Sequence, residues 1–426
     1  MAAQEQENLD SISSVSPAVP PLGVAPATAP GNGATAPTRK RLRGLGKWVA
    51  RVTLAAVLLL GFFLSVVPLG RATTRAAILV PGLLSATQPA PLVVAGEEIS
   101  HTSITISAQN GPVFLDVYAP TSAPALVPGS REAVVMVPGV GDNRTDPQLI
   151  NLSESLARAG IVAVEMTTPA LIGFNITPAD TDAIVQAVLF ASHLPGVNPA
   201  HVGIVGFSGG SVMACRAAAD PRIRDQVAFI TLFGSWFNAA NVLRDFGQRS
   251  VTVDGQTQPF HPYATAIKVM ATIVAGTLPP AESTKLLTAL APGGEPLQHP
   301  EQELPSPGAA AAYHLLAGDD PTHADANIAA LSPALKDLLT ALSPSDFLDQ
   351  IHTPIYLLHD HNDPAIPSVE SGDFAAALTQ MGHKHDFVEF GIFHHTEITS
   401  GFGLGPLLAD GSQLYRILTK VASAGA

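Results

Sequence analysis

From about residue 76 onward, short apolar runs of strand length alternate along the chain with stretches of helical character. The runs are rich in β-branched residues and almost continuous, which is typical of strands buried on both faces of a parallel sheet. They are Val134–Val137, Ile161–Val164, Val202–Val205, Val227–Ile230 and Ile355–Leu358, and the helical stretches include Asp146–Ala159 and Ala179–Ser192. The alternation predicts an α/β fold with a mainly parallel central sheet and helices on both faces.

Two segments suited to an edge hairpin precede these runs. Thr102–Ser107 and Val113–Tyr118 flank Asn110-Gly111. An Asn-Gly pair between strand-like segments is a strong signal for a β-hairpin. The pattern therefore predicts an antiparallel hairpin at the edge of the sheet.

The rhythm of strands and helices stops over residues 243–342. Proline residues interrupt this segment, and helical periodicity is confined to patches such as Thr265–Val274 and Ala326–Leu342. We expect a helical insertion that forms a cap or lid over the sheet, placed before the strand Ile355–Leu358.

The residues before position 76 are organised differently. Residues 1–38 are rich in Ala, Pro, Ser and Gly without apolar periodicity, which predicts a disordered tail. Six basic residues fall within 39–51, a basic juxtamembrane segment, and residues 52–69 carry no charge. This uncharged stretch predicts a transmembrane helix, and the preceding positive charges predict a cytoplasmic N-terminus.

The same uncharged stretch has an alternative interpretation as a cleaved signal peptide. Its apolar run is longer than the roughly 7–15 residues typical of such a segment, and a long tail precedes the cationic part. We therefore expect a single-pass anchor in the cell membrane, with an extracytoplasmic domain over residues 76–426.

Composition narrows the possible partners. Of the 426 residues, 46% are hydrophobic, which is enough for a sizeable core, and the formal net charge is −13. An acidic protein has no electrostatic reason to bind nucleic acid, and none is expected here. Because Cys215 is the sole cysteine, an internal disulfide and a cysteine-based metal site are excluded.

The strongest chemical motif is Gly206-Phe207-Ser208-Gly209-Gly210, which matches the G-x-S-x-G nucleophile elbow. In a chain with 36 glycines such a motif can also occur by chance, and the alternative interpretation is a flexible turn without a catalytic role. The context favours the nucleophile elbow, because a strand-like run ends at Val205 and the helix-forming segment Ser211–Ala219 follows. A sharp strand-to-helix turn would expose the Ser208 hydroxyl above the sheet as a nucleophile.

A serine hydroxyl needs a base to remove its proton, and the base needs a partner to orient it. The segment His359–Pro367 follows the strand Ile355–Leu358 and contains acidic residues. The adjacent pair His394 and His395 follows a last strand over Asp386–Phe390. The order serine, acid, histidine is the one found in α/β-hydrolase triads.

From about residue 100 to its end the chain resembles the α/β-hydrolase superfamily, with the dienelactone-hydrolase and prolyl-peptidase-like branches as the most similar. In that family the acid lies in a loop close to H-G-x-x-D-x-x-[IV]-P, which aligns with His359–Pro367 and implies Asp363 as the acid. Asp360 then occupies the usual glycine position. The spacing Ile-Phe-x-His favours His395 as the base, with His394 as the alternative.

An oxyanion hole needs two backbone N–H donors near the nucleophile. Gly209, directly after Ser208, is one predicted donor. The loop Pro138-Gly139-Val140-Gly141-Asp142 follows the strand Val134–Val137 and predicts Val140 as the second, with Gly141 as a weaker candidate and an ordinary glycine turn as the alternative. The family usually has a histidine where Pro138 stands.

One motif points to metal chemistry. The spacing His359-x-His361-x-Asp363 matches the start of a binuclear zinc signature, and these side chains are proper zinc ligands. The next position is Pro364 where the signature has a further histidine, so the ligand set is incomplete. We expect no metal and no other cofactor.

Together these patterns predict a membrane-anchored serine hydrolase that cleaves a carboxylic ester through an acyl-enzyme, using Ser208, His395 and Asp363. Its substrate would be a small-molecule or lipid-like ester. Two alternatives are a serine peptidase of the prolyl-peptidase-like type and a non-catalytic, membrane-anchored binding module.

Overall fold

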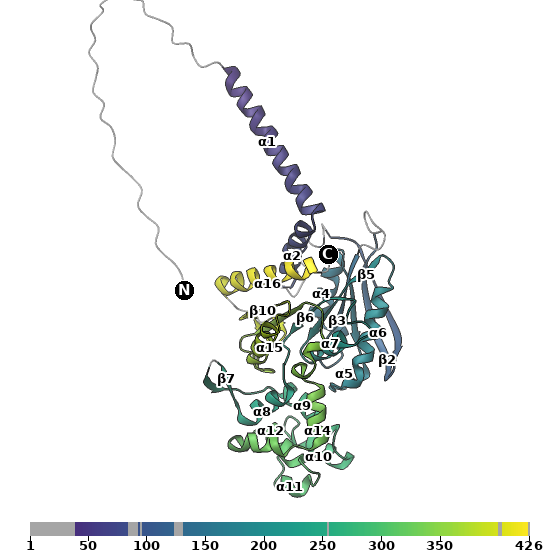
Figure 1. Ribbon diagram of the computed structural model, residues 1–426, viewed down its shortest axis with the longest axis vertical. Coiled ribbons are helices and arrows are strands. Elements are labelled where there is room, and N and C mark those ends of the chain that lie inside the picture. The colour runs from purple at the N-terminus through teal and green to yellow at the C-terminus, as the bar shows by residue number, and fades with distance from the viewer. Residues whose placement is uncertain are drawn as a thin grey trace, which may run out of the picture. The chain divides into compact units, whose positions relative to one another are not determined.

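The computed structural model describes residues 39–83, 93, 96–122, 131–253, 255–398 and 403–424 (Figure 1). The chain divides into two compact units, Met1–Leu59 and Leu60–Ala426. The predicted disordered tail over residues 1–38 lies outside the described residues.

The region predicted as a single transmembrane helix over residues 52–69 contains a break. Helix α1 spans Arg39–Val66, and helix α2 spans Pro68–Leu83. Pro68 has no N–H and disfavours a helical conformation at the preceding residue, which explains why α1 ends before it. Among the described residues no single helix is long and apolar enough to cross a membrane, whereas Arg51–Leu64 and Leu69–Pro81, bent by 83°, meet that requirement as a pair. The membrane span stays a prediction.

An eight-stranded sheet forms the centre of the second unit, in the order β1-β2-β4-β3-β5-β6-β9-β10. Only the pairings of β2 with β1 and β4 are antiparallel, and all other neighbours are parallel. The strands are β1 Ile99–Ala108, β2 Gly111–Pro120, β3 Arg131–Val137, β4 Val162–Thr167, β5 Val197–Phe207, β6 Val227–Phe233, β9 Ile355–Asp360 and β10 His385–Phe390. Each strand predicted from the sequence is present, including the edge hairpin that turns between Ala108 and Gly111.

Helices cover both faces of this sheet. Because successive residues of a strand point to opposite sides, each strand contributes side chains to both helical layers. On one face, Val135 of β3 belongs to the same hydrophobic cluster as residues of α6 Thr181–Ser192, α7 Gly209–Ala219 and α15 Val369–Gln380. On the other face, Val134 and Met136 belong to a cluster with residues of α4 Pro147–Arg158 and α16 Leu404–Ala424. The short helix α5 spans Pro169–Ile172.

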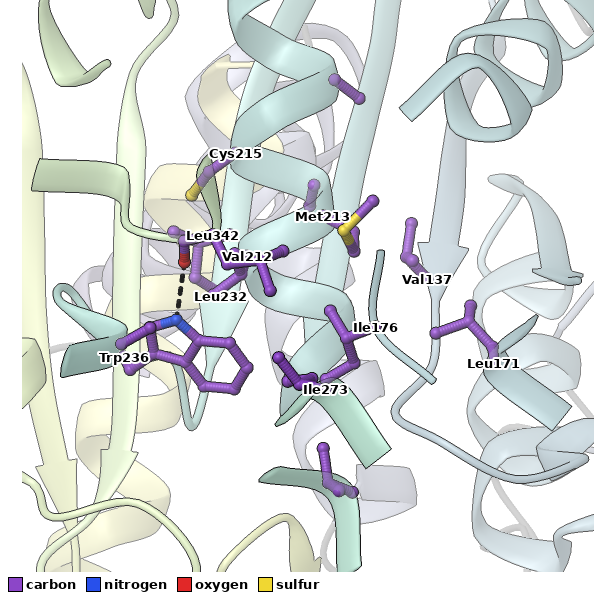
Figure 2. Packing of buried hydrophobic residues seen from close by; sticks show 14 of the residues in the cluster. Val137, Leu171, Ile176, Val212, Met213, Cys215, Leu232, Trp236, Ile273 and Leu342 are labelled. Atoms are coloured by element: carbon purple, nitrogen blue, oxygen red, sulfur yellow. Dashed lines mark hydrogen bonds between the residues drawn. The ribbon is translucent and has the colours of Figure 1, made fainter. Parts of the chain in front are cut away.

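Helix α7, which begins directly after Ser208, is buried along most of its length. Figure 2 shows its residues Val212 and Met213 among side chains from other elements, including Val137 of β3. Nearby, the Trp236 Nε1–H donates to the Leu342 carbonyl at 2.7 Å, which links the end of β6 to the end of the insertion. Close packing of this kind holds the start of α7 in one position.

The insertion over residues 243–342 is mainly helical, as predicted, and its helices lie together at the bottom of Figure 1. The expected helix Ala326–Leu342 is two helices, because Pro333 starts a new one after a break at Leu331–Ser332. A small hairpin of β7 Ser250–Val253 and β8 Gln256–Pro259 was not predicted. The helices are α8 Ala239–Gln248, α9 Ala264–Ala275, α10 Pro280–Ala289, α11 Pro300–Glu303, α12 Ala309–Ala317, α13 Ala324–Ala330 and α14 Pro333–Ala341.

A mainly parallel sheet with helices on both faces and a serine-bearing turn between β5 and α7 is the α/β-hydrolase arrangement. The predicted fold class is therefore confirmed.

Candidate active site

Ser208 occupies the turn between the end of β5 and the start of α7. Its backbone has φ 52° and ψ −130°, a conformation that non-glycine residues rarely adopt. Two hydrogen bonds hold it: the Ser208 N–H donates to the Phe233 carbonyl at 2.7 Å, and the Ser211 N–H donates to the Ser208 carbonyl at 2.9 Å. This is the strained turn expected of a nucleophile elbow.

Crowding explains the glycines on either side of Ser208. A Cβ at position 206 would lie 2.5 Å from Ser211 Cα, and a Cβ at position 210 would lie 2.2 Å from the Val137 carbonyl oxygen. Both neighbours are backbone atoms that cannot move aside. Gly206 and Gly210 are therefore needed for the strand and helix to meet so closely at Ser208.

Asp363 lies in the loop after β9, and both oxygens of its carboxylate have hydrogen-bond partners. Oδ1 accepts the N–H groups of Ala365 at 2.7 Å and Ile366 at 3.0 Å. Oδ2 lies 2.6 Å from His395 Nδ1. Burial raises the pKa of Asp363, but the charges and hydrogen bonds of His395 and His359 outweigh it and hold that pKa well below its usual range. The carboxyl is thus ionised and can orient an imidazole.

His359 contacts Asp363 from the other side and was not predicted as part of the site. Its Nε2 lies 3.3 Å from Asp363 Oδ2 and 3.0 Å from the Ile366 carbonyl oxygen, and its Nδ1 lies 2.6 Å from Ser371 Oγ. Burial lowers its pKa, yet Asp363 more than offsets this and raises it. His359 is the first residue of the His359–Pro367 motif, and this position in the sequence could have indicated that it contacts the acid.

The structure separates His361 from the other two residues of the zinc-like motif, His359 and Asp363, which lie 3.3 Å apart. His359 is fully buried, whereas His361 is exposed and lies 3.7 Å from Glu389. Within the described parts of the chain, no group of three or more His, Cys, Asp or Glu side chains could hold a metal ion.

Of the two adjacent histidines, the structure brings His395 to Asp363. A two-stranded ribbon of β11 Phe393–His394 and β12 Glu397–Ile398 follows β10, and His395 lies in its turn with φ 62°. His395 is buried, and His394 is exposed. The His395 Nε2 is also buried and makes no hydrogen bond within the described residues, Ser208 Oγ included. Catalytic hydrogen bonds are often long without substrate and shorten when it binds.

Asp360 holds the backbone of this turn. It ends β9 and is buried; its Oδ2 accepts the His395 N–H at 3.0 Å, and its Oδ1 accepts the Asn362 N–H at 3.1 Å. Burial raises the pKa of Asp360, although these two N–H groups lower it. Asp360 stands where the related loop motif has glycine. A glycine could not accept the hydrogen bond from the His395 N–H, so the aspartate has a structural role at this position.

The loop after β3 lies against Ser208. A Cβ at Gly139 would be 3.2 Å from Ser208 Cβ. The Gly141 N–H donates to the Leu171 carbonyl at 2.8 Å and is therefore occupied, whereas the described residues offer no acceptor to the Val140 N–H. Asn143 Nδ2 donates to the carbonyls of Gly139 at 3.0 Å and Val140 at 3.3 Å, and so orients the loop in which Pro138 replaces the usual histidine.

Ser208, His395, Gly139 and Val140 line one cavity of about 390 Å³. Tyr263 lines it too, with its ring centroid 6.3 Å from that of His395. Burial, followed by the charges of Asp363 and Glu397, raises the pKa of Tyr263 to about 12, so its hydroxyl stays protonated. Of the described residues of the predicted insertion, only Tyr263 and Thr265 line this cavity, and the other lining residues belong to the rest of the chain.

No protein-family model and no curated protein matches this sequence, but solved structures do. A 2,6-dihydroxy-pseudo-oxynicotine hydrolase is 17% identical over 75% of this chain and 68% of its own, with a TM-score of 0.40. An esterase from Pyrobaculum calidifontis is 18% identical over 83% of this chain and 91% of its own, with a TM-score of 0.42. A Mycobacterium tuberculosis puromycin-hydrolysing peptidase is 15% identical over 78% of this chain, with a TM-score of 0.46.

The chain spans 40% of the length of that peptidase. The activities in these names are those of the other proteins. The fold of the present chain is assigned from its own strand order and from the turn at Ser208.

Proposed function

Because the chain has the α/β-hydrolase fold, we propose that it is a serine hydrolase that cleaves a carboxylic ester through an acyl-enzyme. The observation that carries the proposal is the contact of 2.6 Å between His395 Nδ1 and Asp363 Oδ2. Nε2 of the same ring has no hydrogen-bond partner among the described residues, and the ring lines a cavity that Ser208 also lines. An oriented imidazole in the same cavity as a strained serine is an arrangement suited to nucleophilic catalysis.

In the first half-reaction, Ser208 Oγ attacks the ester carbonyl carbon and its proton passes to His395 Nε2. The tetrahedral intermediate collapses as its bond to the alkoxy oxygen breaks. His395 gives its proton to that oxygen, and the alcohol leaves. Asp363 stays ionised and stabilises the imidazolium while it exists, in keeping with its lowered pKa.

In the second half-reaction, water attacks the acyl-enzyme and gives a proton to His395. The new tetrahedral intermediate collapses to the carboxylic acid, and Ser208 regains its proton from His395. Each intermediate carries a negative charge on the former carbonyl oxygen. The N–H groups of Gly209 and Val140 are proposed to bind this oxygen, and removal of one such donor typically costs about 10²–10³ in kcat.

A fluorophosphonate probe, which reacts covalently with an activated serine, tests the proposal. The wild-type chain is expected to be labelled at Ser208, and Ser208→Ala to lose both labelling and at least about 10⁴-fold in ester turnover. Ser412→Ala is the control, because that serine is exposed and does not line the cavity. Turnover should also be insensitive to chelators.

The opposite results would identify another class of protein. A folded chain that neither reacts with the probe nor hydrolyses esters would be a binding module. Turnover of aminoacyl amides in preference to esters would make it a peptidase.

A further inference from the structure

The cavity at Ser208 continues into the interior, along the face of the sheet that α4 and α16 cover. Strand β3 lines it with the alternate residues Glu132, Val134 and Met136, and Pro138 follows beyond the strand. Six residue steps separate Glu132 from Pro138, a length of about 20 Å at roughly 3.3 Å per residue. The cavity is therefore much deeper than an ester group alone requires.

The helical wall of the cavity is mainly apolar, although Gln148 and Asn151 of α4 also line it. Helix α4 lines it with Leu149, Leu152 and Leu156, which the spacing of three and four residues places on one side of the helix. Helix α16 lines it with Leu414, Ile417, Leu418 and Val421, which share one side for the same reason. Two aliphatic stripes thus face the strand residues across the cavity.

The two ends of the cavity differ. Near Ser208 its lining includes Gln148, Thr396 and Glu397, which are partly or fully exposed. At the other end its lining includes Leu79 of α2 and Glu132, both buried.

Helix α2, which carries Leu79, packs against α16 and α4 (Figure 1). Arg75 of α2 forms an ion pair with Glu132, the first cavity-lining residue of β3. The cavity is therefore open to solvent at the serine and closed at α2.

From this geometry we propose that the cavity binds the acyl chain of a medium-chain alkyl ester, an inference that rests on the proposed ester hydrolysis at Ser208. Each buried methylene contributes through the hydrophobic effect, and a volume of about 390 Å³ falls within the range of small-ligand sites.

The acyl side of the ester, rather than its alcohol side, occupies the closed cavity for a chemical reason. The alcohol must leave before water attacks, while the acyl group stays bonded to Ser208. An alcohol held in a closed cavity could not leave past the acyl-enzyme, whereas an alcohol on the open side departs and makes room for water.

A series of p-nitrophenyl esters from acetate to palmitate tests chain length. kcat/KM is expected to rise from acetate to octanoate by up to about fourfold per methylene, and to fall at palmitate because α2 closes the far end. A steady fall from acetate to octanoate would overturn the proposal. A rise with alkyl length in a parallel series of alkyl acetates, with none in the acyl series, would overturn the assignment of the acyl side.

Two variants change the far end in opposite directions. Ala422 of α16 and Leu79 of α2 both line the cavity. Ala422→Phe is expected to lower the laurate-to-acetate ratio of kcat/KM about tenfold, because the larger side chain would take the space of roughly two methylenes of the acyl chain. Leu79→Ala is expected to raise the palmitate-to-acetate ratio. Ala409→Phe, at an exposed position of the same helix, should leave both ratios unchanged. Unchanged ratios in both cavity variants would overturn the proposal.

Binding of radiolabelled laurate to the Ser208→Ala chain separates this proposal from the proposed function. Saturable binding that Ala422→Phe weakens supports the cavity even if no ester is hydrolysed. Fluorophosphonate labelling of the wild-type chain without laurate binding or chain-length dependence would retain the serine hydrolase and reject the acyl site.

Discussion

The backbone N–H of His395 donates to Asp360 Oδ2 at 3.0 Å, and this bond joins the end of β9 to the turn between β11 and β12. The turn places His395 at φ 62°, which a non-glycine residue keeps only when its surroundings hold it there. Asp360 therefore acts as a positioning residue for the proposed base.

Loss of this positioning should affect turnover more than substrate binding. Asp360→Ala is expected to lower kcat about tenfold to a hundredfold, or ~1.4–2.7 kcal/mol, with a smaller change in KM. Asp360→Asn keeps an acceptor oxygen and should lose less. Steady-state kinetics, with thermal unfolding as a check on folding, measure this. An Ala variant with wild-type kcat would show that the hydrogen bond does not position His395.

The adjacent histidines should differ sharply in their contribution to turnover. His395→Ala is expected to abolish turnover, because its ring contacts Asp363. His394→Ala should cost less than about tenfold, or 1.4 kcal/mol, because that side chain is exposed. kcat at saturating ester is the measurement. If the His394 variant were the inactive one, the assignment of the base would be wrong.

Gly234 lies against the same ring. It has φ 65°, and a Cβ there would be 2.9 Å from His395 Cε1. Gly234→Ala is therefore expected to displace the imidazole and reduce kcat by at least about tenfold. Gly255→Ala is a matched control, because Gly255 has φ 77° with open space around its Cβ position.

Both alanine variants should lose a similar stability of roughly 1 kcal/mol through the left-handed backbone. Only Gly234→Ala should lose activity. Equal kcat values for the two variants would contradict the proposed place of His395.

A buried carboxyl outside the site should make stability depend on pH. Glu165 of β4 is fully buried opposite Asp116 of β2, and within the described residues its carboxyl oxygens have no hydrogen-bond partner. Burial, and next the charge of Asp116, raise its pKa to about 8, while Arg144 opposes this. The folded state thus holds a proton that the unfolded state releases near its ordinary pKa of 4.5.

Stability from this group is therefore complete below about pH 4.5 and is lost as the pH rises to about 8. Glu165→Gln, which cannot ionise, should raise the free energy of unfolding at pH 9 by up to about 5 kcal/mol relative to wild type, the equivalent of a pKa raised from 4.5 to about 8. The difference should shrink towards pH 5. Denaturant unfolding at both pH values measures it, with exposed Glu98→Gln as the control. A difference independent of pH would contradict the raised pKa.

The predicted membrane span over residues 52–69 is tested by fractionation. The full chain is expected to stay in the membrane fraction after carbonate washing, with the domain after residue 76 open to external protease. Secreted protein that begins near residue 72 would show instead that the segment is a cleaved signal peptide.

The sequence by itself determined the sheet and the turn that bears Ser208. Buried parallel strands appear as continuous β-branched runs, and such runs mark β3, β4, β5, β6 and β9. The turn at Ser208 could be recognised locally, because the small residues that its crowding requires, Gly206 and Gly210, lie two positions to either side. Local patterns sufficed where the physical cause was local.

Tertiary structure alone decided which histidine meets Asp363. His394 and His395 are neighbours of identical type, and the choice between them depends on Asp360, 35 residues earlier in the chain. The cavity, too, exists only where α2, α4 and α16 pack on the same face of the sheet. Its depth depends on the side chains that distant elements bring together, and no periodicity within one element carries that information.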